Sequence, residues 1–403
     1  MALMPVADAL AAVVSGVDAL PEESVALEAA YHRVLARDVA ARRTQPPNAM
    51  SAMDGYAVRA ADVATVPARL TVTGEVAAGR PFVGTLHQGN AIRIFTGGVI
   101  PDGADAVVIQ EDTVRDGDVV IVNEPAVAAR HIRPAGVDFR EGDVLLRSGS
   151  RLTDRALSLA ASMNHTLLPV RQRPKVAILA TGDELVSAGG APGPGQIISS
   201  NAYALQALAR AEGADAIDLG TVGDTLDATT AAIRRARDSG VDILVTTGGA
   251  SVGDHDLVKT ALDAEGVAMA FWKIALRPGK PMMHGRLGPM RILGLPGNPV
   301  SSYVCGFLFM APLIRALSGR SDLHPPLEAA QLGADLPEND QRQDYLRARL
   351  ELRTDGLPIA TAVSKQDSSL LGNLSAAQAL IVRPPFAAAA AAGSSCFILK
   401  LPL

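Results

Sequence analysis

The chain has 403 residues, of which 48% are hydrophobic and 20% are charged, and its formal net charge is -5 at pH 7. This length exceeds one ordinary domain and predicts two to four domains with buried cores. The net negative charge excludes a generic nucleic-acid binder, which needs a basic surface, so any anion site must be local. The two cysteines cannot make a disulfide framework, which favours a reducing cytosol.

Helical spacing in residues 6–17 and 24–36 predicts two helices near the N-terminus. The start of the chain lacks a basic region, and Asp8 interrupts its apolar run, so we expect no export signal. The longest uncharged segment, 292–314, contains the turn-forming residues 296–299. We therefore expect too few continuous apolar residues to span a bilayer, and no membrane role.

Short alternating runs between residues 60 and 150 predict a small β-rich domain. Turn residues separate these runs, which cover 68–79, 90–98, 105–112 and 117–124. A helix is predicted at 153–164, ahead of the next domain. Beyond a linker that follows Gly319, four further strands are predicted at 344–352, 358–364, 379–384 and 396–401, which indicates a second small β domain.

From Lys175 onward, strand-like and helix-like segments alternate. Strands are predicted at 175–185, 214–224, 241–249, 267–276, 281–285 and 291–297, and helices at 201–213, 225–240, 256–265 and 299–319. This alternation is typical of a doubly wound α/β domain. Loops rich in glycine, carboxylates or cations follow five of the strands, at 182–184, 223–224, 248–256, 277–280 and 294–298. Because such strand ends share one edge of the sheet, we expect these loops to form one cleft.

The loop 248–256, "GGASVGDHD", combines bare backbone with two aspartates. Glycine-rich turns present N–H groups to anions, whereas aspartates repel anions unless a metal ion lies between them. The loop therefore predicts a phosphate and a metal together. It lacks the Lys-Ser/Thr pair of a P-loop, however, so a tight turn explains it equally well. Asp183 fits a helix cap better than a ligand, and Glu184 fits either role.

Three cations, Lys273, Arg277 and Lys280, surround a proline-glycine turn, where they either gather an anion or form a solvated surface loop. Asn298 and Ser301 lie at a helix N-terminus, which favours both capping and anion binding. Outside the α/β domain, Asp54 reads as an ordinary Asp-Gly turn. Similar loop positions are occupied by Thr96 after a strand and by Asp138 near Arg133.

Seven motifs in order, "SAMDGYAVR", "IRIFTGG", "IRPAGVDF", "TGDEL", "TTGGASVGDHD", "KIALRPGKPMMHG" and "LGLPGNPVSS", resemble the MoeA family of molybdopterin molybdenumtransferases, to which the C-terminal half of gephyrin also belongs. The resemblance covers nearly the whole chain. It implies an elongated homodimer of four-domain subunits with the active cleft between subunits. The implied divisions are an extended helical domain of 1–45 and 140–172, an inserted β-rich domain of 46–139, a molybdopterin-binding α/β domain of 173–322 and a C-terminal β-barrel-like domain of 326–403.

The implied reaction is insertion of molybdate into adenylylated molybdopterin, with release of AMP and assistance from Mg²⁺ in the cytoplasm. On this reading the catalytic residues are Asp54, Glu184, Asp224, Asp256, Lys273 and Arg277, of which Glu184, Asp224 and Asp256 also hold the metal. The residues expected to bind the cofactor precursor are Thr96, Asp138, Gly248, Gly249, Ser251, Lys280, Asn298 and Ser301. The resemblance reverses the interpretation of Asp54, because the family places this loop in the partner subunit's cleft.

Two departures from the family pattern affect this assignment: Arg277 stands where many members have lysine, and Asp254 where many have glutamate. Arginine keeps the charge but offers a bidentate fork, so we expect Arg277 to bind an oxyanion and not to transfer protons. Two alternative functions remain, a molybdopterin adenylyltransferase and a scaffolding module of the gephyrin type. Transient contacts with other proteins of molybdenum cofactor biosynthesis are a further expectation.

Overall fold

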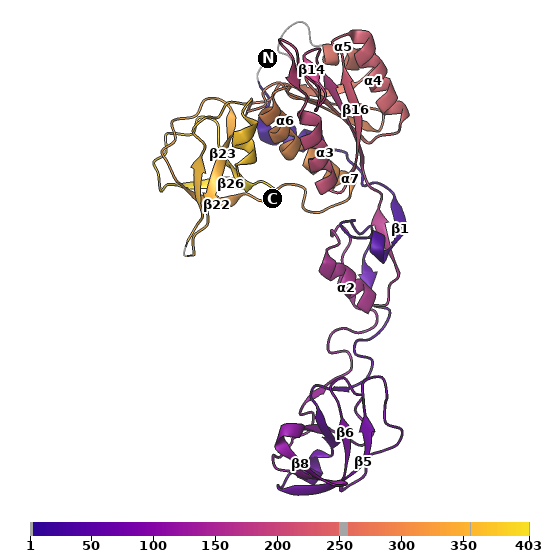
Figure 1. Cartoon of the computed structure of the whole chain (residues 1–403). Helices are drawn as coiled ribbons and strands as arrows, with labels where there is room; N and C mark the ends of the chain where they lie inside the picture. The colour runs from indigo at the N-terminus through magenta and orange to yellow at the C-terminus, as the bar shows by residue number, and fades with distance from the viewer. Residues whose placement is uncertain (1–2, 250–256, 355, 403) are drawn as a thin grey trace.

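The computed structural model describes residues 3–249, 257–354 and 356–402. The molecule is elongated (Figure 1). An α/β domain and a small β domain lie side by side at one end, a slender middle segment follows, and a second β domain occupies the far end.

The α/β domain is built on a six-stranded sheet in the order β16-β13-β17-β21-β20-β18. The strands are β13 (Lys175–Thr181), β16 (Asp215–Val222), β17 (Ile243–Thr247), β18 (Ala268–Trp272), β20 (Met283–Leu287) and β21 (Met290–Leu295). The first four strands of the order run parallel, whereas β20 runs antiparallel to both of its neighbours. The C-terminal ends of β16, β13, β17, β21 and β18 therefore share one edge of the sheet.

Alternate residues of the central strands enter two separate cores, one on each face of the sheet. Val176 and Ile178 of β13 pack in one core, and Ala177 and Leu179 pack in the other. The first core takes α1 (Val6–Val14), α3 (Asn201–Ala211) and the helix after β21, and the second takes α4 (Leu226–Asp238) and α5 (Leu257–Ala264). Helices on both faces explain why these strands are apolar throughout. The predicted doubly wound fold is confirmed.

The helix after β21 runs from Pro299 to Leu317 and consists of α6 (Pro299–Cys305), a π-helical turn (Gly306–Met310) and α7 (Ala311–Leu317). By length and composition it could cross a membrane, so the expectation of too few continuous apolar residues was wrong. Residues 296–298 precede the helix and Pro299 is its first residue, so these turn-forming residues do not interrupt it. Since 83% of its apolar window is buried inside the fold, we interpret it as the core helix of the α/β domain.

The far β domain has a six-stranded sheet in the order β7-β4-β6-β5-β9-β8. Its strands are β4 (Gly55–Val58), β5 (Ala68–Val76), β6 (Asn90–Ile94), β7 (Ala106–Ile109), β8 (Thr113–Asp116) and β9 (Val119–Val122). The four runs read from the sequence all contain strands, while β4 and β8 were missed. Strand β4 is buried along its whole length and follows directly after Asp54, within a motif that reads as a loop.

The middle segment corrects one predicted helix. Residues 24–36 do not form a long helix, because β1 (Glu22–Ala26) pairs antiparallel with β12 (Leu167–Arg171). A short 3-10 turn follows at Leu27–Ala29, and His32 has a φ of 62°, which an α-helix cannot contain. Pairing with a distant strand therefore overrides the local helical spacing. The same segment contains the predicted helix α2 (Asp154–Ser162) and the strand pairs β2 (Val39–Ala40) with β11 (Val144–Leu146) and β3 (Met50–Ser51) with β10 (Ile132–Arg133).

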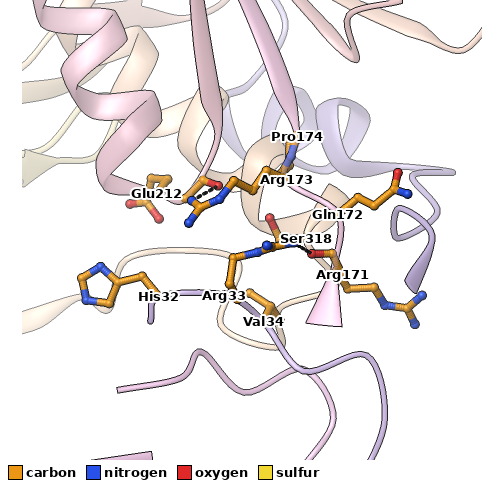
Figure 2. A pocket seen from close by; sticks show the side chains of 10 residues that line it. His32, Arg33, Val34, Arg171, Gln172, Arg173, Pro174, Glu212 and Ser318 are labelled. Atoms are coloured by element: carbon orange, nitrogen blue, oxygen red, sulfur yellow. Dashed lines mark hydrogen bonds between the residues drawn. The ribbon is translucent and has the colours of Figure 1, made fainter. Parts of the chain in front are cut away.

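Arginines fix the middle segment to the α/β domain (Figure 2). Arg173 donates to the Gly213 carbonyl at 3.2 Å, and Arg151 donates to the Ala211 carbonyl at the end of α3 at 2.8 Å. The buried Arg33 holds the middle segment together by donating to the Arg171 carbonyl at 2.6 Å and pairing with Glu23. The cavity between these groups has a volume of about 10 Å³, room for roughly one water molecule. The junction between the middle segment and the α/β domain is therefore closely packed.

The small β domain next to the α/β domain is a closed five-stranded barrel. Its strands are β22 (Glu328–Leu332), β23 (Gln343–Glu351), β24 (Ile359–Ala362), β25 (Ala379–Arg383) and β26 (Ser395–Lys400), and α8 (Leu371–Ser375) precedes β25. The β23–β25 pairing closes the ring. The four predicted strands are confirmed, and β22 was missed.

The predicted strand 267–276 is divided in the structure. Its first part is β18, and its end begins β19 (Leu276–Arg277), which pairs with β23 of the barrel. The break falls at Lys273, whose φ of 81° no strand residue adopts. The last residue of the predicted strand, Leu276, therefore belongs to a different sheet. A further short parallel pair, β14 (Leu185–Val186) with β15 (Ile197–Ile198), lies between β13 and α3.

Candidate functional site

The C-terminal edge of the α/β sheet forms a cleft of about 600 Å³. Loops after β13, β17 and β21 line it, together with residues of the barrel, and the lining includes Thr181, Glu184, Gly248, Gly249, Asn298 and Ser369. An adjoining cavity of about 390 Å³ shares Thr181, Glu184 and Gly249 and adds Asp224 from the loop after β16. The expected convergence of strand-end loops is thus observed for four of the loops.

Gly248 and Gly249 bring backbone to the cleft wall where no side chain fits. Their φ values are 87° and 63°, and a Cβ on Gly248 would lie 2.4 Å from the Thr181 carbonyl oxygen. Backbone without side chains can approach a ligand closely and offer it N–H groups. The remainder of the loop, which includes the predicted site residues Ser251 and Asp256, lies outside the described residues.

We expect Gly248→Ala to destabilise the fold by more than about 2 kcal/mol and to abolish ligand binding, because a left-handed φ and a backbone overlap act together. Gly240→Ala is the matched control, since Gly240 has a φ of 64° and nothing within 4 Å of an added Cβ. The free energy of unfolding of this control should fall by only about 1 kcal/mol, and the control should keep its activity. Urea unfolding measures the stability of both variants, and ligand titration measures their binding. Equal losses of stability and binding in the two variants would show that close backbone approach at Gly248 is unimportant.

The acidic side of the cleft is organised by a pair of loops. Asp224 donates its backbone N–H to Asp183 Oδ1 at 3.1 Å, so the loops after β13 and β16 are tied together. Asp183 therefore does not cap a helix as expected, since residues 183–200 are all described and contain none. Glu184 and Asp224 line the same cavity. Among the described residues there is no group of three or more metal-binding side chains, and Asp256 falls outside them.

The cations after β18 differ in their surroundings. Lys273 places Nζ 4.0 Å from the centre of the Trp272 ring, a cation–π contact. Lys280 is exposed, and its carbonyl accepts hydrogen bonds from the N–H groups of Ile274 and Met282 at 3.2 and 3.1 Å. Its neighbour Pro281 lines the cleft. These contacts fix the turn and place Lys280 beside the cleft.

The third cation, Arg277, is engaged by the barrel. Its Nε donates to Asp344 Oδ1 at 2.6 Å, Nη1 donates to Asp340 at 3.3 Å, and Nη2 donates to Asn339 at 2.9 Å and to Asp344 Oδ2. Four of the five guanidinium N–H groups are therefore used within the protein. Hydrogen bonding to Asp344 also raises the pKa of Arg277.

At the start of the helix after β21, Asn298 is exposed and lines the cleft, and in the described chain its side chain makes no capping hydrogen bond. Ser301 is buried with 4% of its surface exposed and does not line the cleft. The Val300 N–H at this helix end donates to the Ser368 carbonyl of the barrel at 3.0 Å. Of the two predicted residues, only Asn298 therefore faces the cleft.

Sequence reasoning missed the contribution of the barrel to the cleft. Ser369 lines it, and Arg347 of β23 lies beneath the same segment, with Nη2 donating to the Lys365 carbonyl at 3.3 Å. Gln366 ties this segment to the Arg347 backbone through two hydrogen bonds of 3.0 and 2.9 Å. The Arg347 side chain is 1% exposed, and its Nε and Nη1 have no hydrogen-bond partner among the described residues.

Asp54 and Thr96 meet in the far β domain. Asp54 Oδ1 accepts hydrogen bonds from the N–H and the hydroxyl of Thr96, both at 2.7 Å, and these bonds lower the pKa of Asp54. Asp138 is exposed near the base of this domain, where its N–H donates to the Gln45 carbonyl at 3.1 Å. Within one chain the domain of β5 and β6 is remote from the α/β domain (Figure 1), so Asp54 does not reach its own cleft.

The architecture is that of a doubly wound ligand-binding domain combined with a barrel and an extended β domain. Family models match residues 4–164 (MoeA N-terminal region, domains I and II), 177–316 (probable molybdopterin binding domain) and 329–401 (MoeA C-terminal region, domain IV). The chain therefore belongs to the MoeA family.

Relatives named molybdopterin molybdenumtransferase include one from Haemophilus influenzae, 34% identical over 90% of this chain and 93% of that protein. Another, from Bacillus subtilis, is 35% identical over 90% and 86% of the two chains. The crystal structure of a molybdopterin biosynthesis MoeA protein from Pyrococcus horikoshii OT3 is also similar, with a TM-score of 0.86, 28% identity and coverage of 99% and 100%. The likeness thus extends over all domains.

Proposed function

We propose that this protein inserts molybdenum from molybdate into adenylylated molybdopterin and releases AMP. The observation that carries the proposal is the cleft at the sheet edge, where bare backbone at Gly248 and Gly249 lies with the carboxylates of Glu184 and Asp224, and where the exposed Lys280 adjoins the lining residue Pro281. A phosphorylated substrate and an oxyanion need this combination, and the family relatives carry the name of the same activity.

Within the cleft, the N–H groups of Gly248 and Gly249, with Ser251 and Asn298, are proposed to bind the phosphates and position the pterin. Lys273 and Lys280 are proposed to attract the molybdate dianion, and the buried charge of Arg347 adds to the positive potential beneath Ser369. Ser301 and Arg277 were expected to bind ligand as well. Those two roles remain predictions, because Ser301 is buried and Arg277 already donates to Asp344, Asp340 and Asn339.

Glu184 and Asp224 are proposed to hold Mg²⁺ with Asp256 as a third ligand. The fit rests on the cavity that Glu184 and Asp224 line together, since carboxylate oxygens are the ligands that Mg²⁺ prefers. The ion would neutralise charge on the phosphoanhydride during loss of AMP. Glu184 and Asp224 would also orient the attacking water through their remaining oxygens.

We further propose a homodimer in which Asp54 and Thr96 of one subunit complete the cleft of the other, with Asp138 contributing from the same side. Their distance from the cleft within one chain supports this arrangement (Figure 1). The Thr96 hydrogen bonds keep Asp54 ionised and fixed in direction. The free thiols of Cys305 and Cys396 fit the reducing cytoplasm as the compartment.

The test is to incubate the purified protein with adenylylated molybdopterin and to measure AMP release with and without molybdate and Mg²⁺. We expect release that requires both additions and that stops when EDTA removes the metal. Molybdopterin with ATP is the second arm, in which formation of the adenylate would instead identify an adenylyltransferase. If the protein consumes neither adenylylated molybdopterin nor ATP, the result would favour a scaffolding module.

A further inference from the structure

The turn that carries Lys280 is attached to the barrel as well as to its own domain. Strand β19 pairs in parallel with β23, matching Leu276 with Gln343 and Arg277 with Asp344, and the Gln343 N–H donates to the Ala275 carbonyl at 2.8 Å. The turn that follows, 278–280, therefore begins inside the barrel sheet. Any shift of the barrel must move this turn.

The side chain of Arg277 strengthens this attachment. Its bidentate partner Asp344 is 4% exposed, so the carboxylate is shielded from water and has a matched cation. Asn339, the second partner, is itself held by donation from Nδ2 to the carbonyls of Arg342 and Pro384, both at 2.8 Å. The acceptors around Arg277 are thus rigid parts of the barrel.

The barrel also supplies one wall of the cleft. Ser369 and Leu371 line it, and the Ser368 carbonyl accepts from the Val300 N–H at the start of α6. The barrel therefore meets the α/β domain through polar contacts at Arg277 and at Val300, and through Tyr345, Leu380 and Leu399, which share a buried core with the helices of that domain. Pro281, next to Lys280, lines the same cleft as Ser369. The contacts at Arg277 and Val300 involve the segments that carry these two walls, so we expect both contacts to affect the width between them.

We propose that Arg277 is a positioning residue, whose ion pair with Asp344 clamps the barrel against the α/β domain and so sets the spacing of the cleft walls. It acts through Asp344 and does not itself bind the oxyanion. The effect on activity rests on the proposed molybdenum insertion, whereas the clamp itself is a property of the protein without substrate.

The experiment compares Arg277→Gln, Asp344→Asn and the charge-exchanged pair Arg277→Asp with Asp344→Arg. Hydrogen exchange is followed for the amides of 339–346 and 365–371, together with the molybdate concentration that gives half-maximal AMP release. We expect both single variants to speed exchange and to raise that concentration by similar factors, about tenfold for breaking a half-buried charged pair. The exchanged pair should restore much of both. Lys400→Gln, which breaks the exposed pair with Glu328 in the same barrel, is the control and should change neither.

An oxyanion-binding Arg277 gives a different pattern. Asp344→Asn would then free the guanidinium and leave the molybdate response equal or better, and the exchanged pair, with an aspartate at 277, would be inactive. That pattern, or unchanged exchange in both single variants, overturns the clamp. If the parent protein shows no insertion activity, the proposed function fails, while the exchange data still decide the clamp.

Discussion

Two inactive chains, one with Asp54→Ala and the other with Asp224→Ala, should recover activity when they assemble together. In the proposed dimer each cleft takes Asp224 from one subunit and Asp54 from its partner. A mixed dimer then has one cleft with both lesions and one with neither, so it should show up to about half of the parent activity. The two chains are co-expressed with different affinity tags, the mixed dimer is purified through both tags, and AMP release is measured.

A chain that carries both substitutions provides the matched control, when it is paired with a parent chain. The number of lesions is the same, yet every cleft of this dimer lacks one carboxylate, so the composite arrangement predicts no activity. A site contained within one chain reverses both results: the doubly substituted mixture keeps half of the activity, and the mixture of single variants has none. An inactive mixed dimer of the Asp54→Ala and Asp224→Ala chains would therefore contradict the composite cleft.

Arg347→Met is expected to stabilise the protein while removing its response to molybdate. The Arg347 guanidinium is 1% exposed, Nε and Nη1 lack partners among the described residues, and burial lowers its pKa. A buried charge with these two unpaired nitrogen atoms costs free energy, although the charge of Asp367 offsets part of that cost, and a neutral side chain of similar length removes it. The variant also loses the hydrogen bond to the Lys365 carbonyl, which offsets part of this gain. We therefore expect the free energy of unfolding to rise by about 1–2 kcal/mol.

Urea unfolding gives the stability of this variant, and AMP release as a function of molybdate gives its activity. Arg349→Met is the control, because Arg349 lies two residues along β23 at an exposed position. We expect this variant to change the free energy of unfolding by less than about 0.5 kcal/mol and to keep normal activity. A purely structural Arg347 would show the opposite of our expectation, with loss of stability and an unaltered molybdate response in the protein that remains folded.

The sheet and its functional edge could be predicted from the sequence for a physical reason. Strands covered on both faces, such as β13 and β17, are apolar throughout, and the glycines at 213 and 240 end the helices between them. Once the strands are placed, their shared edge follows from the parallel connections. Gly248, Glu184 and Asp224 lie at this edge because each directly follows a strand or its first turn.

Contacts between distant segments could not be predicted in the same way. Residues 24–36 have helical spacing, but β1 pairs with β12, which lies about 140 residues later in the chain. Local periodicity does not indicate such a distant pairing. The burial of Arg347 is equally hidden, because an alternating strand such as 344–352 presents it like any surface arginine. The engagement of Arg277 by Asp344 depends on a strand pairing between two domains.

Activation of a molybdenum-free molybdoenzyme in a defined mixture measures molybdenum insertion by this protein. The mixture contains the purified protein, adenylylated molybdopterin, Mg²⁺ and micromolar molybdate, and the activity of the acceptor enzyme is measured against time. We expect activation that depends on this protein and on molybdate, and that is absent with the Asp224→Ala variant. Activation that proceeds equally with that variant, or with no added protein, would contradict the proposed insertion.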